Sequence, residues 1–184
     1  MASVGYYDFF PEKWTTELRT ATFLEGRRGD PIPAGTFLFT EYYCTDLKCN
    51  CQQVIVRVLH ARSENDRPNE VATIVYSWNP NTDPKWAFLF SDLPNQFLDP
   101  FYRQAPYAPA LLDFWCEMVG YDEAYVARLK RHYHEIRAKF GRAGNPSEAT
   151  PVSHDGEQQR SFRPCTKQER TARKRLLART LKRK

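Results

Sequence analysis

Short runs of alternating apolar and polar residues fill the first half of the chain. In the clearest run, residues 53–61, three valines alternate with other side chains. Successive side chains of a strand point to opposite faces, so this alternation predicts a half-buried strand. Similar runs, rich in β-branched and aromatic residues, occur at 36–43, 70–78 and 85–90, and turn-forming segments separate them. The pattern predicts an antiparallel β-meander.

After Pro109 the apolar residues recur at helical spacing. Pro109 suits a first helical turn and Gly120 a stop, which predicts an apolar helix over residues 110–119. Asp122 can cap a second helix that ends at Gly141. The apolar stripe of this second helix consists of Tyr125, Leu129, Ile136 and Phe140.

These elements predict an α+β fold, in which a twisted antiparallel β-meander is packed by two C-terminal helices. The fold would occupy residues 1–140, followed by a flexible linker over 141–165 and a basic tail helix over 166–184. The fold of residues 1–35 stays open, because residues 17–24 suit a strand while the glycines and prolines that follow interrupt it.

Charge is distributed unevenly along the 184 residues. The net charge is +5, but residues 167–184 hold nine Lys or Arg and one acid, so the rest of the chain is slightly acidic. The first residues lack the positive and apolar regions of a signal peptide, and no stretch approaches 18 apolar residues. We therefore expect a cytoplasmic protein that does not insert into a membrane.

Three of the five cysteines, Cys44, Cys49 and Cys51, fall within eight residues between two predicted strands. An odd number of cysteines in a reducing compartment argues against a disulfide framework. If the strands pair as a hairpin, the three sulfurs converge, and zinc is the ion that most often occupies a thiolate-rich structural site. The alternative is three ordinary thiols in a turn. Candidates for a fourth ligand are Cys165, Cys116, Asp46, a distant histidine or water.

The other histidines and cysteines have simpler interpretations. His132 and His134 point about 200° apart on a helix, so they cannot chelate one ion together. His132 shares the apolar stripe and is expected to be a buried or edge histidine, and His60 is expected to be the same on its strand. Cys116 is expected to pack in the core as a small hydrophobic residue.

The basic tail is the candidate nucleic-acid contact. Its cations would neutralise phosphates without reading sequence. Alternatively its three leucines would dock on a partner, or the segment is simply a solvated end. The candidate phosphate-binding residues are Arg170, Arg173, Lys174, Arg175, Arg179, Lys182, Arg183 and Lys184.

The segments FTEYYCTDLKCNCQQVIVRV, PYAPALLDFW and DEAYVARLKRHY resemble uncharacterised bacterial proteins that often end in a SecA-like zinc-chelating motif, SEC-C. In this resemblance the family's cysteine cluster corresponds to Cys44, Cys49 and Cys51. The chain departs from the family at its end, where a single Cys165 precedes the basic tail instead of a C-x-C…C-[HC] motif. The resemblance implies no reaction and no partner.

No phosphate-cradling glycine loop, nucleophile elbow or paired acidic motif occurs in the sequence. We therefore predict a zinc-stabilised binding protein, without enzymatic activity, whose basic arm contacts DNA, RNA or a ribonucleoprotein. The first alternative is a protein–protein adaptor that docks through the tail leucines. The second alternative is an enzyme with an open Cys₃ zinc site and a bound water.

Overall fold

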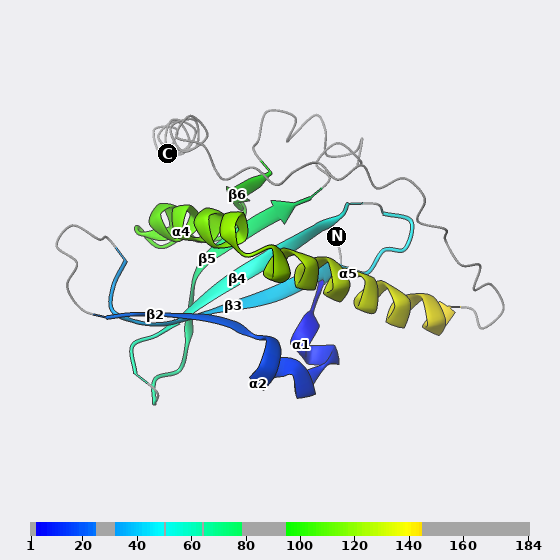
Figure 1. Ribbon diagram of the computed structural model, residues 1–184, viewed down its shortest axis with the longest axis horizontal. Coiled ribbons are helices and arrows are strands. Elements are labelled where there is room, and N and C mark those ends of the chain that lie inside the picture. The colour runs from blue at the N-terminus through cyan, green and yellow to red at the C-terminus, as the bar shows by residue number, and fades with distance from the viewer. Residues whose placement is uncertain (1–2, 25–31, 50, 64, 79–94, 145–184) are drawn as a thin grey trace.

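The computed structural model describes residues 3–24, 32–49, 51–63, 65–78 and 95–144. Within them, a six-stranded antiparallel sheet is packed by helices (Figure 1), which confirms the predicted α+β class. The strand expected over 85–90, most of the expected linker and the whole basic tail lie outside these residues.

Three strands of the predicted meander form the centre of the sheet, and a short strand that was not predicted follows them. The strands β3 (Gly35–Cys44), β4 (Gln53–Ala61), β5 (Asn69–Ser77) and β6 (Gln96–Leu98) follow one another across the sheet, each antiparallel to the last. Buried and partly exposed residues alternate along the whole of β4. Alternation in β4 and the content of β-branched and aromatic residues in β3 and β5 therefore located the three long strands to within one residue at each end.

Residues before β3, whose fold the sequence left open, complete one edge of the sheet. Two short strands share the outer edge of β3: β1 pairs with its C-terminal end and β2 with its N-terminal half. Three single turns of helix join β1 to β2, and the first of them contacts β3. In chain order these elements are β1 (Ser3–Gly5), α1 (Tyr6–Phe9), η1 (Pro11–Lys13), α2 (Trp14–Glu17) and β2 (Arg19–Phe23).

The two helices expected after the sheet are α4 (Ala108–Tyr121) and α5 (Glu123–Gly144). Asp122 caps α5 as predicted, because its Oδ1 accepts a hydrogen bond of 2.9 Å from the backbone N–H of Tyr125. The helix does not end at Gly141, however, and continues to Gly144. A glycine inside a helix costs only about 1 kcal/mol relative to alanine, so the propensity signal was too weak to fix the end.

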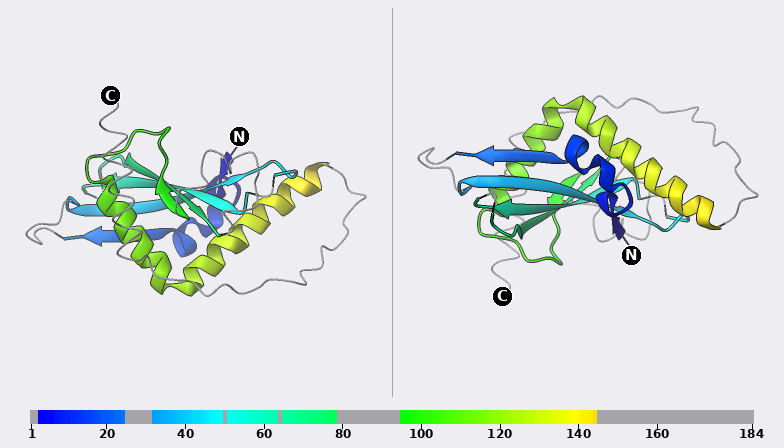
Figure 2. Two further views of the ribbon diagram at one scale, coloured as in Figure 1. Left: turned by 90° about the horizontal axis from the view of Figure 1, so that it is seen from above. Right: turned by 90° about the horizontal axis from the view of Figure 1, so that it is seen from below.

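Both long helices lie on one face of the sheet, as the two further views in Figure 2 show. The core between the layers is centred on Trp115, which is fully buried and stacks on Phe39 with ring centroids 5.7 Å apart. Cys116 lies in the same core, as expected, with 1% of its surface exposed. No helix in the described residues is long and apolar enough to cross a membrane.

Candidate metal site

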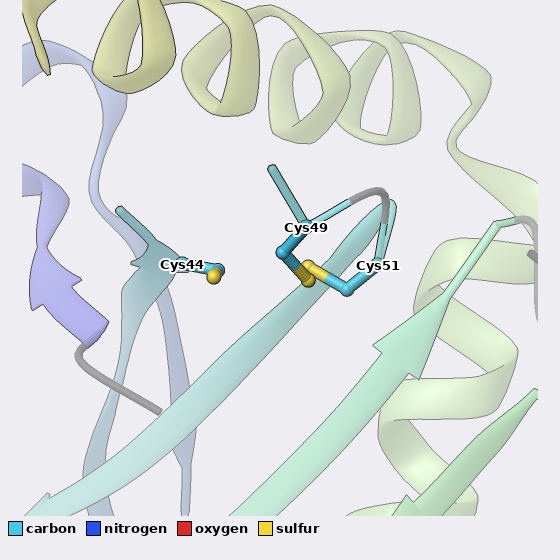
Figure 3. Close-up of side chains that lie close together, drawn as sticks. All are labelled: Cys44, Cys49 and Cys51. Carbon is cyan, nitrogen blue, oxygen red and sulfur yellow. The ribbon is translucent and has the colours of Figure 1, made fainter. Parts of the chain in front are cut away.

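The three clustered cysteines meet at the end of the β3–β4 hairpin. Cys44 is the last residue of β3, while Cys49 and Cys51 come from the loop that leads into β4. Their sulfur atoms all lie within 4.8 Å of one another, and Figure 3 shows the side chains turned toward a common point. Cys44 and Cys51 are each only 5% exposed. The predicted convergence of three sulfurs is therefore present.

Local hydrogen bonds fold the loop that carries Cys49. The Asp46 carboxylate accepts a hydrogen bond of 2.9 Å from the backbone N–H of Lys48, which is the geometry of an Asx turn. The Asp46 carbonyl accepts another, of 3.0 Å, from the Cys49 N–H. At the loop's end Gln52 has a φ of +42°, a left-handed conformation that turns the chain back into β4. The turn is thus held by hydrogen bonds that do not involve the sulfurs.

Helix α5 holds this loop from outside through Arg137. One guanidinium nitrogen donates to the carbonyls of Asp46 and Cys49, at 3.0 and 2.8 Å, and the other donates to the Leu47 carbonyl at 2.7 Å. The guanidinium also lies over the Tyr133 ring, 5.3 Å from its centroid. Three loop carbonyls are therefore paired by one side chain, which fastens the cysteine loop to the helix.

The electrostatics of the cluster favour protonated thiols as long as no cation is bound. Burial raises the pKa of the Cys51 thiol above its ordinary value, and the neighbouring Cys44 and Cys49 raise it further. Burial also raises the pKa of Cys49. A divalent cation reverses this preference, since it stabilises the thiolate forms that repel one another when it is absent. Sulfurs bound to one tetrahedral zinc at about 2.3 Å are about 3.8 Å apart, so only a small closure is needed.

The structure describes most of the residues that could serve as a fourth metal ligand, but it does not describe Cys165. In the described part of the chain, no histidine nitrogen, carboxylate oxygen or further sulfur joins the three sulfurs within 4.8 Å. Cys116 is enclosed in the helix–sheet core, and the Asp46 carboxylate is engaged in its own turn. Cys165 lies outside the described residues. A water molecule or a residue outside these ranges is left for the fourth position.

A second polar site surrounds His132. As predicted this histidine is buried, with none of its surface exposed, but its surroundings are not apolar. Its Nδ1 lies 2.6 Å from Oε2 of the fully buried Glu41, and its Nε2 lies 2.5 Å from Oε2 of Glu17. A neutral imidazole has one N–H, so these two contacts require either a doubly protonated ring or a protonated carboxyl.

Neighbouring groups complete the polar cluster. The Tyr43 hydroxyl donates to Glu41 at 2.7 Å, and the Tyr6 ring stacks on His132 with centroids 3.6 Å apart. Partial burial acts to raise the pKa of Glu17, but the hydrogen bond with His132 and the nearby cations outweigh it and hold that pKa below its ordinary value. The cluster thus connects the N-terminal turns to β3 and α5.

Two residues of these sites were missed from the sequence. Glu41 shares the period of Phe37, Phe39 and Tyr43, so strict alternation along β3 does place it on the buried face. A partner for it was not visible, because His132 lies 91 residues away. Nothing in the sequence around Arg137 indicates that it binds the cysteine loop, because it is one of several basic residues on the polar face of α5.

The eight tail residues proposed to contact nucleic acid lie outside the described residues. The likeness to bacterial proteins with SEC-C tails stays a prediction from the residues alone. No protein-family model, curated protein or solved structure matches this chain.

Proposed function

We propose that this chain is a zinc-stabilised binding protein without enzymatic activity, whose basic C-terminal arm contacts nucleic acid or a ribonucleoprotein. The observation that carries the metal part is the convergence of three cysteine sulfurs within 4.8 Å at a largely buried position. Zinc fits because it is redox-silent and prefers thiolate sulfur in four-coordinate sites. The site closes a hairpin and lies against α5, as a structural ion would.

The non-enzymatic part rests on the surroundings of the sulfurs. A catalytic zinc keeps an exchangeable water next to a general base and within reach of a substrate. In the described residues, carboxylates and histidine nitrogens are not among the groups that gather with the sulfurs. The histidine–carboxylate pair of His132 and Glu41 is fully buried, and its contacts are internal. This arrangement suits stability better than turnover.

Metal content tests the proposal directly. Protein purified as the full chain without added metal is expected to hold about one equivalent of zinc by elemental analysis. Cys49→Ser removes one thiolate and is expected to lose most of the metal. Cys116→Ala is the matched control, because it removes a buried thiol outside the cluster and should leave the metal content unchanged. Absence of metal in the wild type, or equal metal in both variants, would refute the site.

The proposed contact between the basic arm and nucleic acid rests on the concentration of positive charge in residues 166–184. Deleting residues 166–184 removes nine bases and leaves the described sheet and helices whole, so folding should survive. Nucleic-acid affinity of the full chain is expected to fall steeply with salt and to vary little with base sequence, since each neutralised phosphate contributes about 0.7–0.9 to the salt slope. Fluorescence anisotropy with labelled RNA and DNA measures both.

Two results, one from this titration and one from binding to a protein partner, would redirect the proposal. If the truncated protein binds nucleic acid as tightly as the full chain, the contact lies on the folded body and the arm proposal is wrong. If binding to a protein partner is lost when Leu176, Leu177 and Leu181 become alanine, and salt weakens it only slightly, the tail acts as an adaptor through apolar burial.

A further inference from the structure

A cavity of about 430 Å³ opens at the end of the β4–β5 hairpin, on a different set of residues from the cysteine cluster. Its volume lies in the range of about 300–1,000 Å³ that small-molecule sites occupy. His60 and Tyr107 form part of its wall, and Arg62, Asp66 and Arg67 contribute from the hairpin loop. Among the described lining residues, two guanidinium groups stand against one carboxylate, so this part of the lining is net positive.

The wall of the cavity is held in place by hydrogen bonds and stacking. His60 is 8% exposed and stacks on the Phe37 ring, with centroids 4.3 Å apart and planes within 7°. Its Nε2 lies 3.0 Å from the carbonyl of Ala34, so Nε2–H is the donor of that contact. Nδ1 lies 3.5 Å from the Tyr107 hydroxyl, at the long limit of a hydrogen bond. The Nε2 contact and the stacking on Phe37 therefore hold the imidazole in place.

The backbone beside His60 is shaped for this close fit. Gly35 has a φ of +135°, and a Cβ at this position would lie 2.4 Å from the His60 Nε2. A side chain there would push the imidazole out of place, and the conformation itself favours glycine. The wall is thus preformed, which lowers the ordering cost of binding a ligand.

Two arginines, Arg62 and Arg67, line the same cavity as His60 and Tyr107. Burial raises the pKa of Tyr107, and the positive charge of Arg62, which lines the same cavity, opposes this shift. Arg62 and Arg67 are both exposed, and no hydrogen bond or ion pair between either guanidinium and another described residue is present. Guanidinium forks match the oxygens of a phosphate group, and the amide of Asn69 adds a further donor to the lining.

We propose that this cavity binds a phosphate monoester of a small hydroxylated molecule, with the phosphate between Arg62 and Arg67 and a ligand hydroxyl donating to Asp66. The Asp66 carboxylate repels a second anionic group on the ligand. The site therefore selects a ligand with one phosphate and neutral hydroxyls. The inference does not depend on zinc or on the basic arm.

Titration of the full chain with ribose 5-phosphate, followed by two-dimensional NMR, tests this site. The largest shift changes are expected at His60, Asn69 and Tyr107, and ribose without the phosphate should cause no saturable change. Arg62→Ala with Arg67→Ala should weaken binding at least tenfold. Arg103→Ala, which removes an exposed arginine outside the lining, should leave the affinity unchanged.

Three results would overturn the site. If ribose shifts the same resonances with equal affinity, the phosphate is not recognised. If the double variant binds ribose 5-phosphate as tightly as the wild type, the phosphate is bound by other positive charges of the chain. The same holds if the resonances of His60, Asn69 and Tyr107 do not shift. Because both arginines are exposed, the double variant is expected to fold, and its amide spectrum verifies that.

Discussion

Removing the metal from the full chain is expected to lower its melting temperature by about 10 °C. A ligand present at about 1,000 times its dissociation constant stabilises the folded state by about 4 kcal/mol, and a domain of this size loses about 2–4 °C for each kcal/mol. The loss should centre on the hairpin end, where Cys44 and Cys51 are buried with sulfurs that the ion would hold together. Calorimetry with and without a strong chelator measures the shift.

The Cys49→Ser variant supplies the control for that experiment. It should melt near the temperature of the chelated wild type, and chelator should change it little, because the two perturbations remove the same interaction. A wild type that melts identically with and without chelator would contradict a structural metal. An additive effect of chelator on the variant would show that the chelator acts elsewhere.

Arg137→Ala distinguishes the ion from the loop that carries its ligands. The variant keeps all three sulfurs but loses the hydrogen bonds to the carbonyls of Asp46, Leu47 and Cys49. It should melt lower than the wild type, and chelator should still lower it further. The two effects would thus be separable within one protein.

Replacing His132 with alanine is expected to destabilise the protein by about 3–5 kcal/mol. The substitution leaves Glu41 buried in the core with Tyr43 as its remaining hydrogen-bond partner there, and breaking a buried pair leaves an uncompensated polar group. His134→Ala is the matched control on the same helix, because His134 is exposed, and it should change stability by about 0.5 kcal/mol or less. Urea unfolding of both variants measures the difference.

Two further measurements identify the cause. Changing Glu41 and His132 together to leucine should recover much of the loss, since the buried polar pair is then replaced by apolar side chains. In His132→Ala the pKa of Glu17 should rise toward its ordinary value, which NMR titration can follow. Zinc content should stay unchanged. Loss of zinc from the His132 variant alone would instead identify this histidine as a metal ligand.

Much of the fold was predictable because its signals are local. Alternation along β4 and the start of α5 at its Asp122 cap both depend on neighbouring residues, and each was located from the sequence. The convergence of the three sulfurs was also predictable, because a hairpin brings together the residues on either side of its turn, and this does not depend on the rest of the chain.

What escaped prediction depends on contacts between distant segments. The N-terminal turns carry no strong period of their own and are placed by pairing with β3 and by contacts to α5. His132 was correctly assigned to the interior from its helical face, but its glutamate partners come from 91 and 115 residues away. A pattern along the chain shows which face is buried, and it does not show what the buried side chain meets.

The contacts of the first turns also impose an order on folding during synthesis. Tyr6 and Lys13 bind Glu135, at sequence separations of 129 and 122 residues, so these contacts form only after α5 has been synthesised. At about 5–20 residues per second this wait lasts about 6–25 s. β1 and β2 precede β3 in the chain and can pair with it during that time, but the turns between them still lack their contacts with α5. Until α5 folds, the segment that covers the outer edge of β3 is therefore held by strand pairing alone, and loss of that pairing would expose a β-edge to intermolecular contacts.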